Sequence, residues 1–528
     1  MRREFILVTL VVWLATFAIA SIEPLFLYSL VLWVPLTILG LVDMLQRKKS
    51  LRRNFPLMAH FRYLFEMIRP EINQYFVESN TDGRPYSREQ RSVIYQRAKR
   101  ALDTLPFGTQ TDVYEVGYEW LTHSLDPKHV DPNALRVTIG NSQSKHPYSS
   151  SILNVSAMSY GALSKNAILA LNGGAKLGNF YHDTGEGGLS PYHLQPGGDL
   201  VWEIGTGYFG ARTKDGKFDP EKFRDKASHP NVKMVELKLS QGAKPGHGGI
   251  LPASKLTPEI AGIRGVELGH DVVSPPSHSA FSTPIGLIEF VGKMRELSGG
   301  KPAGFKLCIG KRREFISLCK AMVKTGIYPD FILVDGGEGG TGAAPPEFSN
   351  HVGSPLREAQ IFVHNALVGF GLRKHIKIIV TGRIVTGFDV VARLASGADV
   401  CASARAMMMA LGCIQALRCN SNNCPTGVAT QDPALTYGLI PDEKRVRVAS
   451  YHRETVKSAA ELIGAMGLHH SSELRPWHLM KRTGLAEVRH YGELYSFIEE
   501  GSLLGKDLPK EFARAVGAAS AESFSTAG

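Results

Sequence analysis

The stretch "FILVDGGEGGTG", Phe331–Gly342, is a short apolar run that stops abruptly in a polar loop rich in glycine. The same pattern, a short apolar run followed by a polar loop, repeats from Ser151 onward, with helical segments between the runs. Alternation of this kind is typical of repeated β/α units. The stretch therefore predicts an α/β fold in which each strand ends in a functional loop.

Eight runs of this kind are present, and eight strands close a parallel (β/α)8 barrel, the TIM-barrel fold. Such barrels place their sites at the carboxyl ends of the strands, where the polar loops lie here. An open doubly wound sheet is the alternative, because it also binds ligands at that edge. No G-x-G-x-x-G that opens a helix supports it. The predicted strands are Ile152–Ser159, Phe180–Thr184, Leu200–Gly205, Val232–Leu239, Ala303–Cys308, Phe331–Val334, Ile376–Val380 and Val400–Ala404.

The chain has 528 residues, too many for one small core. We expect two transmembrane helices in residues 1–45, a helical collar or linker in 46–148, the barrel in 149–432 and a helical tail in 433–528. The formal net charge is +11, but no aromatic-interleaved basic stretch accompanies it. A nucleic-acid partner is therefore not expected.

Two charge-free apolar runs, Phe5–Ile22 and Leu25–Val42, lie near the start of the chain. Each is near the lower limit for spanning a bilayer. "MRRE" precedes the first run and "RKKSLRR" follows the second, which predicts a hairpin in the cell membrane with both ends and the catalytic domain in the cytoplasm. A cleaved signal peptide is an alternative, given "AIA" at Ala18–Ala20. A buried hairpin is disfavoured because neither run has a polar face.

The last two predicted strands end in "TGR", Thr381–Arg383, and "SAR", Ser403–Arg405. Many barrels bind a phosphate at this place, with backbone N–H groups and an arginine. The loop Asp335–Gly342 adds five glycines where side chains would block a planar ring. These loops predict an FMN site. Its expected residues are Gly336, Gly337, Gly339, Gly340, Gly382, Arg383, Ser403, Ala404 and Arg405.

Three of the six cysteines, Cys413, Cys419 and Cys424, fall in one short segment. Three is an odd number for disulfides, and the other three cysteines lie in apolar runs typical of core. Structural zinc prefers four ligands, whereas a three-ligand iron–sulfur cluster fits this spacing. If a helix continues from Arg405 through Cys413, the thiols lie beside the predicted phosphate site.

The motifs "SAMSYGALS", "TGEGG", "QGAKPGHGG", "GGTGA", "TGR" and "LGCIQALRCNSNNCPTGVATQDP" resemble the FMN-binding domain of the glutamate synthase large subunit. The whole chain resembles the short, membrane-anchored large subunit-like proteins that lack a glutaminase domain. The resemblance implies an oxidoreductase acting on CH–NH2 donors, with FMN and a [3Fe–4S] cluster. Its implied reaction makes L-glutamate from 2-oxoglutarate and ammonia.

The resemblance also implies roles for individual residues. Arg264 and Lys244 would bind the carboxylates of the oxo acid. For two of these lysines an ordinary structural role is the alternative. Lys244 would form a surface salt bridge, and Lys238 would be an exposed lysine at a strand end. The other implied roles are catalysis by Glu186, Lys238 and Gln241, contact with FMN by Met158, Ser159 and Thr184, and cluster ligation by Cys413, Cys419 and Cys424.

Several positions depart from the family pattern. His247 replaces an acid, Ile250 replaces a glutamine, and Glu338 is one carbon longer than the aspartate of the family. An apolar side chain at 250 cannot make the amide's hydrogen bonds, so a related 2-oxo acid is an alternative substrate. No glutaminase segment or NAD(P)H motif is evident. Free or partner-supplied ammonia, or an amine, is therefore expected.

The same absence predicts a separate electron donor or acceptor, which would be an NAD(P)H-oxidising subunit, a ferredoxin or a membrane carrier. The reaction could also run in reverse, as an amino-acid dehydrogenase. Two other functions stay open. An FMN-dependent α-hydroxy-acid oxidase shares the barrel but has no use for three clustered cysteines, and a non-catalytic electron-transfer subunit would keep the cofactors only.

Overall fold

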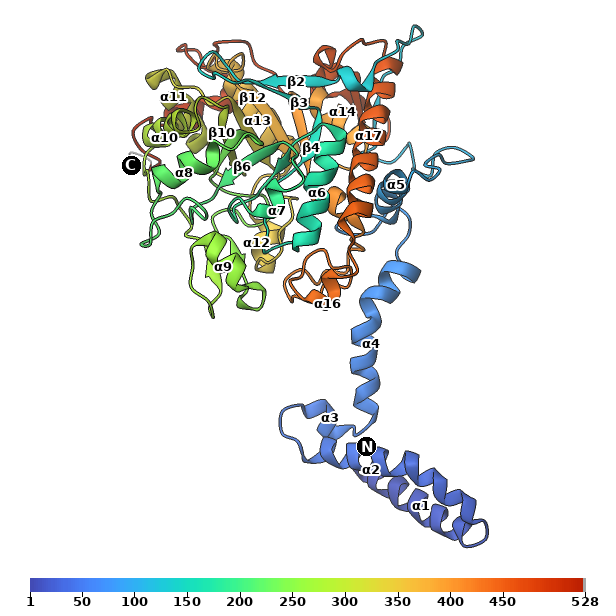
Figure 1. The fold of residues 1–528 in the computed structure, drawn as a ribbon. Helices are drawn as coiled ribbons and strands as arrows, with labels where there is room; N and C mark the ends of the chain where they lie inside the picture. The colour runs from blue at the N-terminus through green and yellow to red at the C-terminus, as the bar shows by residue number, and fades with distance from the viewer. Residues whose placement is uncertain (526–528) are drawn as a thin grey trace. The chain divides into compact units, whose positions relative to one another are not determined.

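The computed structural model describes residues 1–525 of the chain. It divides into two compact units, Met1–Arg88 and Glu89–Gly528. The larger unit holds a closed barrel of eight parallel strands, which confirms the predicted TIM barrel (Figure 1). In order around the barrel, the strands are β4 (Leu153–Val155), β5 (His182–Asp183), β6 (Leu200–Ile204), β7 (Val232–Lys238), β10 (Ala303–Leu307), β11 (Phe331–Asp335), β12 (Lys377–Thr381) and β13 (Val400–Ser403).

The barrel closes where β13 pairs with β4, with Ala402 opposite Asn154. This pairing rules out the open doubly wound sheet. Each predicted run contains one strand, to within one residue at its carboxyl end, except that β4 stops four residues early. Ser156–Ser164 instead forms the loop at the active edge, where the N–H groups of Ser156 and Met158 donate to Ser403 O and Asp183 O at the ends of β13 and β5.

The amino-terminal end of the barrel is closed by a hairpin of β2 (Arg136–Ile139) and β3 (Tyr148–Ser151). Ile139 and Tyr148 join the same buried cluster as barrel residues such as Met234 and Phe331. Burying each such side chain contributes about 1.5–3 kcal/mol. The core therefore fills one end of the barrel and leaves the carboxyl end to polar groups.

Helices alternate with the strands because cap residues begin and end them at fixed points. Ser164, Thr283 and Thr386 each accept a backbone N–H bond at a helix start. Gly326 ends α11 with φ +68°. These helices are α6 (Lys165–Gly178), α7 (Pro191–Leu194), α8 (Pro220–Ala227), α9 (Pro258–Arg264), α10 (Pro284–Leu297), α11 (Arg312–Thr325), α12 (Pro346–His351), α13 (Leu356–Gly369), α14 (Gly387–Ala395) and α15 (Arg405–Leu411).

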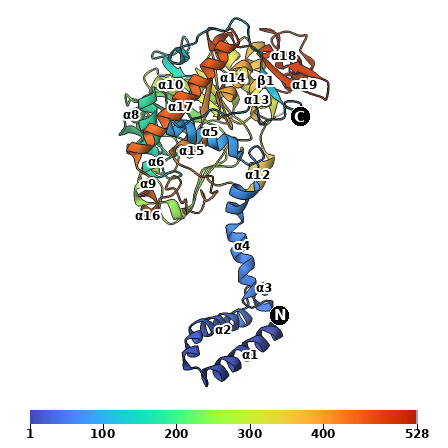
Figure 2. The same cartoon turned by 90° about the vertical axis from the view of Figure 1, so that its right-hand side faces the viewer.

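The carboxyl-terminal region packs on the barrel through α17 (Pro441–Ala465), which lies along α6 (Figures 1 and 2). Gly174 of α6 permits this approach, since a Cβ there would lie 2.6 Å from Val448. Helix α5 (Arg88–Lys99) joins α17 through Arg97 and Arg100, which donate to Thr455 and Ser450. The remaining helices are α16 (Pro433–Thr436), α18 (Tyr491–Leu494) and α19 (Lys510–Gly517).

The tail is not wholly helical. Strands β14 (Leu479–Arg482) and β15 (Val488–His490) form an antiparallel sheet with β1 (Glu119–Leu121). The sequence does not predict this sheet, because its strands are short and their partners lie far apart in the chain. Two further short strands, β8 (Ile250–Leu251) and β9 (Val272–Val273), pair in the long loop after β7.

The smaller unit contains the two predicted apolar helices, α1 (Arg2–Ala20) and α2 (Leu30–Leu45), joined by a 3-10 turn (Pro24–Ser29). They pack as a hairpin, in which Trp13 Nε1 donates to Thr37 Oγ1 at 3.0 Å. The segments Arg2–Ala20 and Pro24–Leu45 are long and apolar enough to cross a membrane. In the most apolar 18-residue stretch of each, only 11% and 6% is buried, respectively. The unit continues with α3 (Ser50–Asn54), α4 (Met58–Ile72) and a π-helical turn (Asn73–Val77).

Candidate active site

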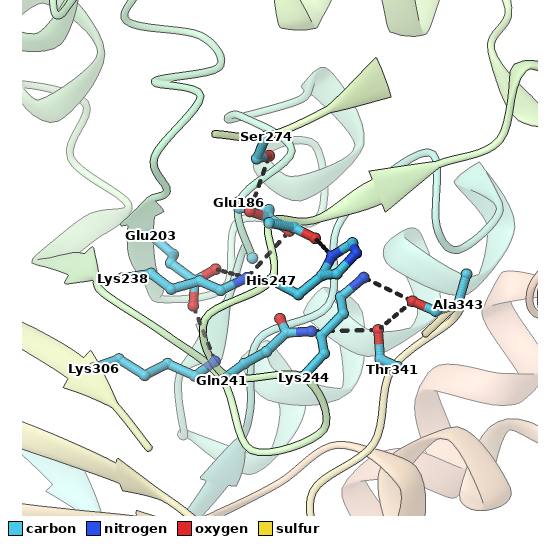
Figure 3. Close-up of polar contacts among 12 residues, drawn as sticks. Glu186, Glu203, Lys238, Gln241, Lys244, His247, Ser274, Lys306, Thr341 and Ala343 are labelled. Atoms are coloured by element: carbon cyan, nitrogen blue, oxygen red, sulfur yellow. Dashed lines mark hydrogen bonds and ion pairs between the residues drawn. The ribbon is translucent and has the colours of Figure 1, made fainter. Parts of the chain in front are cut away.

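A chain of charged side chains lies at the carboxyl end of the barrel (Figure 3). Glu186 follows β5, Glu203 belongs to β6, Lys238 ends β7 and Lys306 lies on β10. Lys238 Nζ is 3.1 Å from Glu186 and 4.0 Å from Glu203, and Lys306 Nζ is 3.0 Å from Glu203. The barrel thus holds two glutamates and two lysines in alternation.

Glu186 is held as a carboxylate by the cations around it. Burial raises its pKa, but the attraction and hydrogen bond of Lys238, with the charges of Arg264 and Lys244, lower it overall. Burial in turn lowers the pKa of Lys244 to about 8, against the attraction of Glu186. Three cations therefore surround one carboxylate, and the mouth of the barrel favours added negative charge.

Arg264, at the end of α9, is only 4% exposed. Its guanidinium lies 5.1 Å above the Phe209 ring and donates to Tyr160 O at 3.4 Å. Its Nε is buried and has no partner among the described residues. A Cβ on Gly187 would lie 2.9 Å from Arg264 Nη2, so the "TGEGG" loop needs glycine there. An arginine with an unused buried donor beside Glu186 suits a carboxylate ligand.

Lys244 and Gln241 lie in the loop after β7, which packs against the loop after β11. Lys244 Nζ donates to Ala343 O at 2.7 Å, and Gln241 Nε2 donates to Thr341 Oγ1 at 3.3 Å (Figure 3). This bond uses one of the three N–H donors of the ammonium, so the others remain for a ligand. The adjoining pocket, about 20 Å³, is lined by Glu186, Thr206, Lys238, Gln241, His247 and Gly249, among others.

The substituted residues lie in the same loops. His247 lines the pocket, with its Nδ1 3.0 Å from Gly248 O and its ring edge-on to Phe348. Ile250 begins β8 and is partly buried. Glu338 accepts a hydrogen bond from the Leu356 N–H at 2.9 Å. The longer carboxylate therefore fixes the start of α13.

The predicted phosphate residues lie on neighbouring strand ends, since Thr381 of β12 is opposite Ala402 of β13. Arg383 takes φ +48°, and Arg405 begins α15. Arg405 Nη2 donates to Glu338 O at 2.6 Å, and a Cβ on Gly340 would lie 2.7 Å from Arg405 Nε. A side chain at position 340 would therefore displace this guanidinium. Two arginines and a glycine cradle are a donor set that fits a phosphate.

The remaining expected flavin residues lie at the strand ends beside the predicted phosphate residues. Some of their polar atoms already make hydrogen bonds within the protein. Ser403 Oγ donates to Ile384 O at 2.7 Å, and Thr184 Oγ1 accepts from the Glu203 N–H at 3.1 Å. Gly185 has φ +64° and lies against Ser159 N, where a Cβ would approach to 2.8 Å. The structure also places Met158, Ala404, Gly336, Gly337, Gly339 and Gly382 in these strand-end loops.

The cysteine segment is not a continuation of α15. The helix ends at Leu411 because Gly412 takes φ +119°, so Cys413 lies outside it and the helical placement of this thiol is wrong. Gln415, Leu417 and Asn422 also have positive φ, between 55° and 59°. Non-glycine residues in this region store strain, which concentrates at functional sites.

Hydrogen bonds tie the segment to the loop after β4. Asn422 Oδ1 accepts from the Gln431 N–H at 2.7 Å, and Gln431 Nε2 donates to Gly161 O and Leu163 O at 3.0 and 2.8 Å. Asn422 Nδ2 donates to Ser254 O at 3.0 Å. The cysteines are therefore held against the barrel edge although no helix carries them there.

The three thiols influence one another. Burial, together with Cys419 and Cys424, raises the pKa of Cys413 to about 12. Burial also acts to raise the pKa of Cys424, but hydrogen bonds from Thr426 and from backbone N–H groups lower it overall. In the described part of the chain, Asp183, Glu203 and Glu236 are the one group of three metal-ligand types within 4.8 Å. The thiols are more widely spaced than the sulfurs of one tetrahedral zinc ion, about 3.8 Å apart.

Four charged residues and one serine of this site are not predicted from the sequence. They are Asp183, Glu203, Glu236, Ser274 and Lys306. A signal exists for four of them, because an acid or lysine interrupts apolar strands in "HDT", "VWEIG", "MVELK" and "GFKLC". Ser274 carries no such signal, and only the fold brings its Oγ to 3.5 Å from Glu186.

A family model described as the conserved region in glutamate synthase matches residues 111–469. The glutamate synthase large subunit-like protein YerD of Bacillus subtilis (strain 168) is 35% identical over 480 residues, which cover 83% of this chain and 91% of that protein. The chain belongs to the glutamate synthase family. The resemblance expected from the motifs is thereby confirmed.

Other members extend the comparison. The archaeal glutamate synthase [NADPH] of Methanocaldococcus jannaschii is 34% identical over 364 residues, covering 68% of this chain and 67% of that protein. The archaeal-type glutamate synthase [NADPH] of Thermotoga neapolitana is 34% identical over 321 residues, covering 60% of each chain. This glutamate synthase-family chain is thus an oxidoreductase. All of its candidate site residues lie within the matched region.

Proposed function

We propose that this glutamate synthase-family protein catalyses the reductive amination of 2-oxoglutarate, or a related 2-oxo acid, to L-glutamate or the matching amino acid. The observation that carries the proposal is the mouth of the barrel, where Lys238, Lys244 and Arg264 all act on the single carboxylate of Glu186. A 2-oxo dicarboxylate would bring two negative charges to this excess of cations. The ammonia would be free or supplied by a partner.

FMN is the proposed cofactor of the barrel. Arg383 and Arg405 would hold its phosphate, and the loops Gly336–Gly340 and Met158–Ser159 would border its ring. Reduced FMN, when bound, would supply the hydride that reduces C2 of the imine formed from ammonia and the oxo acid. Support comes from the family membership and from the glycine loop beside Arg405.

The chain's own residues would orient the substrate and move protons. Arg264 would fix one carboxylate from its buried position, and Lys244 would bind the second while Ala343 O holds its ammonium in place. The Glu186 carboxylate would take a proton from the incoming ammonium, and Lys238, 3.1 Å away, would return one to the departing oxygen. Gln241 would line the same floor.

A [3Fe–4S] cluster is the proposed electron entry point, with Cys413, Cys419 and Cys424 as ligands. Their wide spacing and the strained backbone of their segment support a cluster over a single zinc ion. The names of the relatives from Methanocaldococcus jannaschii and Thermotoga neapolitana specify NADPH. For this chain we propose a separate donor, which would be an NAD(P)H-oxidising subunit, a ferredoxin or a membrane carrier.

The apolar hairpin would anchor the enzyme to the cell membrane, with the catalytic unit in the cytoplasm. In this proposal residues 1–45 are the anchor, 46–148 the linker, 149–432 the catalytic domain and 433–528 the supporting tail. The basic cluster Arg47–Arg53 directly follows α2, as the positive-inside rule requires.

Anaerobic flavin spectroscopy tests this function. Photoreduced enzyme should be reoxidised by 2-oxoglutarate together with ammonium, but by neither alone, and L-glutamate should bleach the oxidised flavin. Pyruvate with ammonium tests the need for a second carboxylate. Bleaching by 2-hydroxyglutarate with no response to glutamate would instead identify a hydroxy-acid oxidase. A flavin that responds to none of these substrates would contradict the proposal.

A further inference from the structure

Three carboxyl groups meet inside the barrel on three consecutive strands, beneath the active site. Asp183 lies on β5, Glu203 on β6 and Glu236 on β7, and none is more than 1% exposed. An oxygen of each lies within 4.8 Å of the others. We call these residues the acid triad.

The acid triad has too few donors for three negative charges. Lys306 of β10 binds Glu203 at 3.0 Å, and the Gly185 N–H donates to Asp183 at 3.0 Å. Asp183 Oδ2 and both carboxyl oxygens of Glu236 are buried without a partner among the described residues. An unpaired buried carboxylate is strongly disfavoured, so at least one member of the triad holds a proton at neutral pH.

Glu236 is the member best placed to hold that proton. As a carboxylate it has no donor, but as a carboxylic acid it can donate to Glu203. Burial, the charge of Asp183 and this hydrogen bond raise its pKa well above the ordinary value, although Lys306 acts to lower it. Burial and Glu203 raise the pKa of Asp183 to about 7. The buried hydroxyl of Tyr181 also faces Glu236 and offers no charge.

We propose that Glu236 stores a proton beneath the active site and that Glu203 passes it to Lys238 after Lys238 has given its own proton to the departing oxygen. The route runs from Glu236 to Glu203 within the acid triad and from Glu203 to Lys238 at 4.0 Å, and Figure 3 shows the second of these contacts. A separation of 4.0 Å is too long for a hydrogen bond, so Lys238 must swing from Glu186, 3.1 Å away, toward Glu203 to collect the proton.

The transfer balances without a change in the charge of the relay. Lys238 is a neutral amine once it has protonated the departing oxygen. Glu236 gives its proton to the Glu203 carboxylate, and Glu203 gives one to Lys238. At the end Glu236 and Glu203 are carboxylates, and Lys238 is again an ammonium. No electrons move in this step. Delivery of the proton rests on the proposed reductive amination, because that reaction consumes protons. Storage of a proton on Glu236 does not depend on the proposed function.

Infrared difference spectroscopy of the ligand-free, full-length protein tests the store. The wild type at neutral pH should show a carboxylic-acid C=O band that shifts in D₂O, and Glu236→Gln should abolish it. The amide keeps a donor toward Glu203, so the fold is spared an empty cavity. Asp330→Asn is the matched control, because Asp330 is a fully buried carboxylate paired with Arg295 at 2.9 Å at the opposite barrel end. It should leave the band unchanged.

The absence of the band in the wild type, or its persistence in Glu236→Gln, would overturn the store. If Glu236→Gln does not fold, Glu236→Asp must shift the band, and an unshifted band has the same meaning. Elemental analysis adds an independent check. A stoichiometric divalent cation that Glu236→Gln releases would show that the acid triad is a metal site and that the proposal is wrong.

Steady-state kinetics test delivery. Glu236→Gln should lower kcat by about tenfold or more, leave the KM of the 2-oxo acid unchanged and alter the pH profile of kcat. A lost band with an unchanged pH profile of kcat would overturn delivery. If the wild type shows the band but turns over no 2-oxo acid, the proposed function fails while the store stands.

Discussion

At the scale of single residues, the site depends on cations that are buried without full compensation. Arg264 keeps an unpartnered Nε, and Lys244 is held by a carbonyl rather than by an acid. Buried charges of this kind are costly unless a ligand completes their hydrogen bonds. Both residues are therefore expected to contribute mainly to substrate binding and turnover.

Replacing Arg264 by alanine should leave flavin and iron content intact and lower kcat/KM for 2-oxo acids. The loss of transition-state stabilisation should be about 2–5 kcal/mol, because one partner of a buried charge pair is lost. Arg212→Ala is the matched control, since its guanidinium also lies over the Phe209 ring, at 5.6 Å. Steady-state kinetics should show a much smaller loss there. Equal losses in the two variants would show that Arg264 only supports packing.

The lowered pKa of Lys244, about 8, predicts a pH dependence of binding. Below pH 8 the ammonium is present, and above it the neutral amine no longer attracts a carboxylate. The KM of the oxo acid should thus rise above about pH 8, by roughly tenfold per pH unit. Lys244→Arg should move the rise to higher pH. A KM profile that is identical in both proteins would exclude Lys244 as the titrating group.

At the scale of elements, the segment from Cys413 to Cys424 owes its conformation to side-chain hydrogen bonds rather than to regular structure. Its backbone visits the left-handed region three times at residues other than glycine, and Asn422 and Gln431 anchor it to neighbouring loops. Such a loop can present three thiols to one face. A helix would space them by its own period.

Cys419→Ser should remove the iron–sulfur cluster, because a serine hydroxyl replaces one of only three thiolate ligands. Iron and sulfide content and the EPR signal of the oxidised protein measure the loss. Cys319→Ser is the control, since Cys319 is a buried thiol of α11 outside the cysteine segment. Stoichiometric zinc without iron in the wild type would refute the cluster.

At the scale of the whole molecule, the apolar hairpin and the barrel belong to different compact units. Every candidate cofactor and substrate residue lies in the larger unit. The hairpin is therefore expected to determine where the enzyme resides and not whether it binds its cofactors.

Deletion of residues 1–45 should move the protein from the membrane fraction to the soluble fraction while its FMN content per chain stays the same. Cell fractionation and flavin fluorescence after denaturation measure the two effects, with the full-length chain as reference. A truncated protein that is folded by circular dichroism but free of flavin would show that the hairpin also supports the site.

Local pattern in the amino-acid sequence is enough to predict the strands and the family of this protein. Short apolar runs ending in glycine loops identify eight strands, and loop motifs identify the family, because strand burial and turn chemistry act over a few residues. The runs around Phe331 and Val400 match their strands almost residue for residue. The end of α15 at Gly412 was the local signal that this pattern missed.

Contacts between residues far apart in the chain become visible only in the folded protein. Ring closure brings Asp183, Glu203 and Glu236 within 4.8 Å from three separate strands, and the long loop after β7 returns Arg264 to the Glu186 loop. The sheet of β1 with β14 likewise joins segments that are far apart in the chain. No short-range pattern encodes such contacts, because their stability arises from burial and charge pairing between elements that the closed barrel alone aligns.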